Sequence, residues 1–190
     1  MRPLDSPVRL HLVVTTGEEP SRSRGLENEV VDLFDQLRDP VFRYVLALGL
    51  APDDGEDVLQ EVFLALFRHL LLGRDRRNLR GWIFRVAHNL SLKRRVASQR
   101  AARREDPGVD VADTVPDQAP SVEEQMVFHE NTARLGAVLR ALPEQDQHCL
   151  RLRAEGLRYR EIAAVLGISL GSVSLSLTRS LARMQRAGGR

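Results

Sequence analysis

The sequence is poor in the residues that build disulfide frameworks and thiolate metal sites. Its 190 residues include one cysteine, one tryptophan and one lysine, and 5% of them are aromatic. A single cysteine excludes an internal disulfide and a multi-cysteine zinc site within this chain, and it fits a reducing compartment. The other 27 basic residues are arginines. This excess reflects either codon usage or phosphate binding, for which the guanidinium group is well suited.

Long hydrophobic runs are also missing. Within the first 25 residues the apolar run at 10–14 is too short for the core of a signal peptide. No later run approaches the roughly 20 apolar residues of a membrane helix. We therefore expect a cytoplasmic protein without membrane insertion, and a flexible N-terminal tail over residues 1–25, where prolines are scattered among polar residues.

The sequence offers no catalytic or cofactor site. The five histidines are dispersed, and there is no glycine-rich phosphate-binding loop. Cys149 lies on the apolar face of a predicted helix, so we expect it in the core. We predict no enzyme activity, no metal and no cofactor.

Charges are segregated along the chain, although the net charge is only +2. Residues 53–61 carry five acidic residues, and residues 105–130 carry eight, without any Lys or Arg. Residues 74–104 carry eleven basic residues against one acidic residue, and residues 151–190 carry eight against two. Two basic blocks separated by an acidic one favour binding partners, with nucleic acid for the basic blocks, over plain solvated helix faces.

Apolar residues recur at helical spacing in the first half, which predicts a domain of three or four helices over residues 26–104. Asp39 and Pro40 interrupt the first apolar stripe. Asp53 or Asp54 can cap the next helix, whose acidic first turn suits the helix dipole.

A basic loop follows at residues 73–78, and a long helix begins near Leu79. Trp82 lies one turn before Val86 on this helix. That spacing favours a core role for Trp82 over a platform for base stacking.

Residues 105–120 contain three prolines and four aspartates without a helical stripe, which predicts a flexible acidic linker. Residues 121–124 fit a capping box that restarts a helix, so a second domain spans residues 121–187. Pro143 opens a further helix, which Gly156 ends. The expected fold class is all-α, with two small helical domains.

Residues 159–184 have the spacing of a DNA-binding helix-turn-helix. Ala163 is small where two helices cross, Gly167 suits a left-handed turn, and Ser169 can cap the second helix. The residues expected to face inward on that helix are Val173, Leu177, Leu181 and Met184. The N-terminal residues of the second helix of such a motif enter the major groove. The candidates are Leu170, Gly171, Ser172, Ser174, Leu175 and Thr178, with Arg179 and Arg183 for phosphates.

Taken together, these motifs resemble those of bacterial RNA polymerase sigma factors of the extracytoplasmic-function (ECF) class, from about residue 28 to residue 186. The resemblance is carried by residues 54–64 (DGEDVLQEVFL), 79–90 (LRGWIFRVAHNL), 142–144 (LPE) and 159–169 (YREIAAVLGIS). It implies a subunit that binds core RNA polymerase, recognises a two-part promoter and helps to open the DNA. It also implies an anti-sigma protein as a partner.

The resemblance assigns a role to each charged block. The acidic helix, with Asp57, Gln60 and Glu61 beside Phe63 and Leu59, would dock on the largest polymerase subunit. The basic loop, with Arg76, Arg77, Asn78 and Arg80, would hold a flipped base of the non-template strand. Arg85, His88, Asn89 and Lys93 would face the duplex. The acidic linker would thread through the polymerase.

The recognition helix departs from the family pattern. Many relatives carry Lys or Arg where this chain has Ser174 and Ser176, and Leu175 is unusually apolar for a groove face. Reading of the upstream element would then rest on hydroxyls, methyl contacts and DNA shape. Lys93, in turn, replaces a usual acid. Two alternatives remain: a helix-turn-helix regulator that does not depend on polymerase docking, and an interaction module held by an anti-sigma protein.

Overall fold

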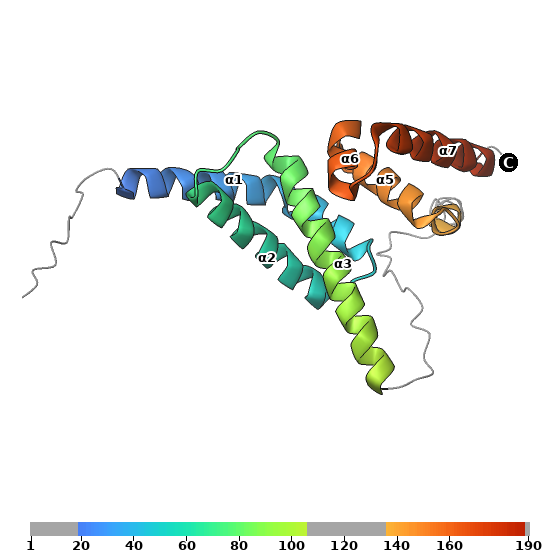
Figure 1. Cartoon of the computed structure of the whole chain (residues 1–190), viewed down its shortest axis with the longest axis horizontal. Helices are drawn as coiled ribbons and strands as arrows, with labels where there is room; N and C mark the ends of the chain where they lie inside the picture. The colour runs from blue at the N-terminus through green and yellow to red at the C-terminus, as the bar shows by residue number, and fades with distance from the viewer. Residues whose placement is uncertain (1–18, 106–135, 189–190) are drawn as a thin grey trace, which may run out of the picture.

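The computed structural model describes residues 19–105 and 136–188, where helices joined by turns and loops are present and no strand is found (Figure 1). The helices are α1 (Glu19–Leu46), α2 (Pro52–Leu71), α3 (Leu79–Glu105), α5 (Glu144–Ala154), α6 (Tyr159–Leu166) and α7 (Leu170–Gly188). The two-domain, all-α architecture agrees with the prediction. The tail at residues 1–18, the linker beyond Glu105 and the capping box at 121–124 lie outside the described residues.

The first domain is a bundle of α1, α2 and α3, which pack on one another. Two expectations about α1 were wrong. This helix begins at Glu19, seven residues before the expected boundary, and it continues through Pro40 without a break. Pro20 lies in the first turn, where a missing N–H costs nothing. Leu37 and Val41 flank Pro40 and are both buried in the same core, so packing keeps the two halves of α1 in one helix.

The start of α2 differs from the predicted cap. Ala51 is the N-cap residue, and Pro52 opens the helix without a side-chain capping bond. Proline is favoured there because its fixed φ matches the helix and its missing N–H needs no partner. Asp53 and Asp54 lie in the first turn. Their negative charges interact favourably with the positive end of the helix dipole there, as expected.

The basic loop ends in a side-chain cap on α3. Asn78 has a φ of +59°, and its Oδ1 accepts a hydrogen bond of 3.1 Å from the backbone N–H of Gly81. A Cβ at position 81 would lie 2.5 Å from the Asn78 amide nitrogen, so a larger residue there would displace the capping side chain. Trp82 is half-buried against the core, and its ring centroid lies 4.5 Å from that of His69. A core role for Trp82 is thereby favoured, as predicted.

The second domain has the predicted helix-turn-helix. Gly167 takes a φ of +66° between α6 and α7, and the chain turns by 107° between them. Ser169 Oγ accepts a hydrogen bond of 3.1 Å from Ser172 N–H, which confirms the predicted cap. Leu181 is 51% exposed, so its predicted inward position was wrong. None of the described helices is by itself long and apolar enough to span a membrane, although α6 and α7 pass the same test as a bent pair.

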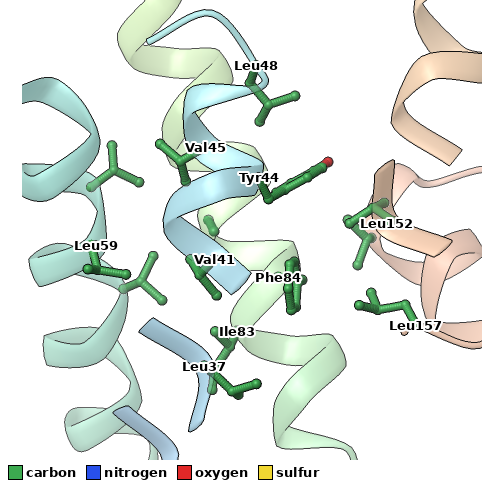
Figure 2. Packing of buried hydrophobic residues seen from close by; sticks show 14 of the residues in the cluster. Leu37, Val41, Tyr44, Val45, Leu48, Leu59, Ile83, Phe84, Leu152 and Leu157 are labelled. Carbon is green, nitrogen blue, oxygen red and sulfur yellow. The ribbon is translucent and has the colours of Figure 1, made fainter. Parts of the chain in front are cut away.

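One apolar core crosses the boundary between the two domains. Leu152 of α5 and Leu157, which precedes α6, are fully buried. Figure 2 shows both facing Tyr44 and Phe84 of the first domain. α6 packs on α3, whereas α7 packs on α5 and α6 and extends away from the first bundle (Figure 1).

The turn at Gly167 gives a first test. Gly167→Ala is expected to lower the free energy of unfolding by about 1–2 kcal/mol, because a Cβ is disfavoured at positive φ. The matched control is Gly25→Ala in α1, where nothing lies within 4 Å of an added Cβ and φ is not positive. That change should be neutral or stabilise by up to about 1 kcal/mol. Urea unfolding measures both, and equal shifts would contradict the account of the turn.

Candidate polymerase and nucleic-acid interfaces

The acidic helix α2 presents the three predicted polymerase-binding residues to solvent. Asp57, Gln60 and Glu61 are all exposed. The expected apolar neighbours, Leu59 and Phe63, are instead buried at 6% exposure each, because they face α1 and α3. Leu64 is 50% exposed one turn beyond Gln60 and supplies the apolar part of this surface.

Arg94 of α3 holds the acidic residues of α2 in place. Its guanidinium lies 3.1 Å from Asp57 Oδ2, 3.6 Å from Asp54 Oδ1 and 3.8 Å from Glu61 Oε1. It also donates a hydrogen bond to the backbone carbonyl of Asp54. Three carboxylates around one cation leave a net negative surface. Sequence reasoning counted Arg94 only as part of the basic block and missed this role.

Three of the predicted loop residues make contacts within the first domain. Arg77 forms a two-pronged ion pair with Asp75, with N···O distances of 2.9–3.1 Å, and this pairing lowers the pKa of the Asp75 carboxyl. Arg76 pairs with Glu29 of α1 at 2.9 Å. Asn78 caps α3. Arg76 and Arg77 nevertheless remain more than half exposed, so their guanidinium groups are accessible to an anion.

The long helix α3 separates the four residues predicted to face the duplex. Arg85, Asn89 and Lys93 are exposed. The expectation for His88 was wrong, since it is only 6% exposed. It lies on the face of α3 that meets α1 and α5, where its Nδ1 shares a hydrogen bond of 2.9 Å with the Tyr44 hydroxyl. Burial, and then the charge of His148, lower the pKa of His88 to about 4.

The recognition helix α7 exposes most of its predicted groove-facing residues. The exposed ones are Leu170, Gly171, Ser174, Leu175, Thr178 and Arg183. Ser172 is half-buried, and its backbone N–H donates to the capping hydroxyl of Ser169. Ser176 is only 1% exposed and accepts a hydrogen bond from Gln145 of α5 at 3.3 Å. The suggestion that Ser176 replaces a cation in the groove was therefore wrong, because this position faces the protein.

Arg179 is a link between helices in this structure and not the free phosphate ligand that was predicted. Its Nε and Nη2 donate to the two carboxylate oxygens of Asp146 at 2.8 and 2.6 Å. Asp146 is fully buried on α5, and the hydrogen bonds from Arg179 lower the pKa of its carboxyl. The pair fastens α7 to α5.

Arg80, the remaining loop candidate, lies at the boundary between the domains. It donates to the backbone carbonyl of Glu155, whose carboxylate pairs with Arg43 of α1 at 2.9 Å. An open hollow of about 910 Å³ adjoins this contact, lined by Asn78, Arg80, Gly156, Arg158, Tyr159, Arg160 and Glu161. Three of its lining residues are arginines.

Comparison with known families matches both domains. The Sigma-70 region 2 model matches residues 33–101, and the Sigma-70 region 4 model matches residues 132–184. The ECF RNA polymerase sigma factor SigE of Mycolicibacterium smegmatis is 31% identical over 187 residues, which cover 94% of this chain and 67% of that protein. This chain belongs to the ECF family of RNA polymerase sigma factors. As a sigma factor it acts in transcription initiation, through RNA polymerase and promoter DNA.

Other relatives agree. The ECF sigma factor RpoE of Cereibacter sphaeroides is 28% identical, covering 84% of this chain and 86% of that protein. Among solved structures, RpoE of Bartonella quintana in complex with the anti-sigma factor NepR has a TM-score of 0.59 at 19% identity, covering 82% and 96% of the two chains. CnrH, solved with the cytosolic domain of CnrY, has a TM-score of 0.57 at 21% identity, covering 88% and 92%. These two structures share the fold.

The Arg179–Asp146 pair gives a second test. Arg179→Ala leaves a buried carboxylate without its partner and is expected to cost about 2 kcal/mol of unfolding free energy, less than for a fully buried pair because Arg179 is half exposed. Arg183→Ala on the same helix should change stability by no more than about 0.5 kcal/mol.

The pH dependence of the same variant supplies its control. Because the folded-state pKa of Asp146 is lowered, its contribution is present above the unfolded pKa of about 3.9 and is lost as pH falls below it. The difference between the wild type and Arg179→Ala should therefore shrink below about pH 4. Equal free energies of unfolding of the two arginine variants at pH 7 would show that the Arg179–Asp146 pair does not stabilise the packing of α7 on α5.

Proposed function

We propose that three surfaces of this chain carry out successive parts of transcription initiation. The acidic face of α2 docks on core RNA polymerase, the basic loop and α3 engage the downstream promoter element, and α7 reads the upstream element. The observation that carries the proposal is the order of these surfaces on one chain, with the acidic face of α2 on the first domain and the exposed recognition helix α7 on the second. We place the first domain from the start of α1 to residue 104, the linker at 105–120 and the second domain at 121–187.

Polymerase docking rests on the α2 surface made by Asp57, Gln60, Glu61 and Leu64. Its exposed carboxylates suit a basic partner helix, and Leu64 adds an apolar contact at its edge. Arg94 fixes the carboxylates from behind, so less side-chain freedom is lost on binding.

Contact with DNA by the first domain rests on Arg85, Asn89 and Lys93, which lie on the outer side of α3, and on Arg76 and Arg77 in the loop. Cationic groups offset the phosphate charge, and unstacking a base costs a few kcal/mol that such a surface can offset. The chain acts as a specificity subunit without chemistry of its own.

An anti-sigma protein is a further proposed partner. The solved relatives RpoE of Bartonella quintana and CnrH were each determined with a protein bound, an anti-sigma factor in the first case. This chain shares their fold and exposes apolar side chains on α7, among them Leu170, Leu175 and Leu181. A regulator that covers these leucines would block the recognition helix.

The docking surface is tested by charge reversal. Asp57→Arg combined with Glu61→Arg should reduce co-purification with core polymerase and run-off transcription by at least about tenfold, since it places like charges opposite a basic partner. Asp35→Arg, at an exposed position on α1, should leave both unchanged. If transcription persisted after the double charge reversal, the α2 surface would not be the polymerase docking site. Specific DNA binding without any polymerase association would favour the alternative of a polymerase-independent helix-turn-helix regulator.

The recognition helix is tested by adding a cation. Ser174→Arg puts a guanidinium on the exposed groove face, and the salt dependence of promoter binding should steepen by about 0.9 in log–log slope. Ser176→Arg inserts the same group into a buried position, so it should destabilise the domain, as shown by urea unfolding. Equal behaviour of the two serine variants would contradict the orientation of α7.

A further inference from the structure

We propose that His69 is a positioning residue for recognition of the downstream promoter element. It fixes the shape of the basic loop at residues 73–78 and thereby increases the selectivity for the unpaired base that this loop receives. The contact through which it acts, called here the histidine clasp, joins the His69 side chain to the backbone carbonyl of Asp75 and to the Trp82 ring. This inference rests on the proposed function of the loop, and it adds a residue outside the basic groups assigned to DNA.

The polar half of the histidine clasp is one hydrogen bond to the loop. His69 lies in the last turn of α2, and its Nε2 is 2.8 Å from the backbone oxygen of Asp75. A carbonyl oxygen can only accept, so Nε2 carries the hydrogen and His69 is the donor. The loop connects the end of α2 to the start of α3 (Figure 1). The hydrogen bond therefore joins the middle of the loop to the helix that precedes it.

The second half of the clasp is a ring contact with α3. The ring centroids of His69 and Trp82 are 4.5 Å apart, with an angle of 41° between the ring planes. Trp82 is half-buried against the core of the first domain, and its backbone N–H donates to the Asn78 carbonyl at 3.1 Å. Aromatic rings at this separation attract each other, so the contact opposes rotation of His69 away from Asp75. One imidazole thus contacts α2's own loop and α3 together.

The two ends of the loop are set by local backbone geometry. Gly73 has a φ of +62° at the start of the loop, and Asn78 has a φ of +59° at its end. Asparagine is one of the few residues besides glycine that tolerate this left-handed region. The backbone N–H of Arg74 donates to the carbonyl of His69 at 3.2 Å. The middle of the loop, in contrast, is held by the side chain of His69 through Asp75.

Fixing the backbone of Asp75 also fixes the direction of a loop arginine. The Asp75 carboxylate accepts hydrogen bonds at 2.9 Å from both the backbone N–H and the Nη2 of Arg77. Arg76, which lies between them in the sequence, pairs with Glu29 of α1. A guanidinium group that is positioned before binding loses less side-chain freedom when it meets a phosphate or a base. The clasp therefore acts on DNA recognition through the loop, without a contact between His69 and DNA.

Base selectivity distinguishes this positioning role from a purely structural one. His69 is only half-buried, whereas Leu66 and Leu70 beside it on α2 are fully buried in the core. Loss of the clasp should leave the helices folded while the loop samples more shapes, because its local stability is lower than that of the core. A loop with several shapes accepts several bases. The ratio between the most and least favoured base should therefore fall more than total transcription does.

Three substitutions separate the two halves of the clasp. His69→Gln removes the ring but keeps an N–H donor that can reach the Asp75 carbonyl. His69→Phe keeps the ring contact with Trp82 and removes the donor, and His69→Ala removes both. Gln36→Ala shortens a polar side chain at an exposed position on α1 and is the matched control.

The first experiment measures base selectivity with the holoenzyme. The genomic fragment that gives the wild-type holoenzyme its strongest run-off product is randomised over its downstream element, and each template carries a transcribed barcode. Selectivity is the ratio of transcript yields between the most and least favoured base at the position of strongest preference. It should fall about threefold to tenfold in His69→Phe and His69→Ala, the range for one lost hydrogen bond. His69→Gln and Gln36→Ala should keep the wild-type ratio.

The second experiment uses Trp82, the single tryptophan of the chain, as a local reporter in the free protein. Acrylamide should quench its fluorescence more strongly in His69→Ala than in wild type, because the ring that covers one side of the indole is missing. His69→Phe should keep the wild-type quenching although it loses selectivity. Circular dichroism and urea unfolding confirm that each variant is folded.

Each outcome either supports the clasp or overturns it. Wild-type selectivity in His69→Phe, with unchanged Trp82 quenching to show that the ring is in place, would overturn it. An equal loss of transcript from every template in His69→Phe and His69→Ala, with unchanged ratios, would also overturn it, since that marks a purely structural residue. If the wild-type chain gave no promoter-specific product with core polymerase, the proposed function would fail instead.

Discussion

The packing of Leu152 and Leu157 on the ring pair of Tyr44 and Phe84 is the contact on which the arrangement of the two domains depends. It joins segments on either side of the linker, and the packing of α6 on α3 extends it. Once it forms, Glu144 and Glu155 lie within reach of Arg95 and Arg43. His148 is brought onto His88 by the same contact. The apolar contact therefore positions the charged and titratable groups at the domain boundary.

Arginine has two separate uses in this sigma factor. Some arginines link helices through ion pairs with carboxylates or a hydrogen bond to a backbone carbonyl, as Arg94, Arg179 and Arg151 do. Arg85 and Arg183 point into solvent, where a nucleic acid can reach them. The planar guanidinium group serves both uses because it binds a carboxylate, a carbonyl or a phosphate with the same donors. A count of basic residues along the sequence therefore overstates the cationic surface that is available to DNA.

Local chemistry explains what could be predicted from the sequence. Gly167 at positive φ, the Ser169 cap and the start of α3 at Leu79 depend on neighbouring residues, and each was predicted correctly. The face that a helical residue presents depends on which partner helices pack on it. His88, Ser176 and Arg179 were assigned to DNA because they lie in basic or groove-facing stretches, yet α1 and α5 cover or bind them. Pro40 was read as a break because local propensity ignores the common core on its two sides.

The most direct test is the structure of this chain in complex with core RNA polymerase and a promoter fork, determined by electron cryomicroscopy. We expect Asp57 and Glu61 to contact a basic polymerase surface, and the exposed face of α7 with Ser174 to lie in the major groove of the upstream element. A complex in which α2 faced solvent, or in which α7 lay outside the groove, would contradict these roles.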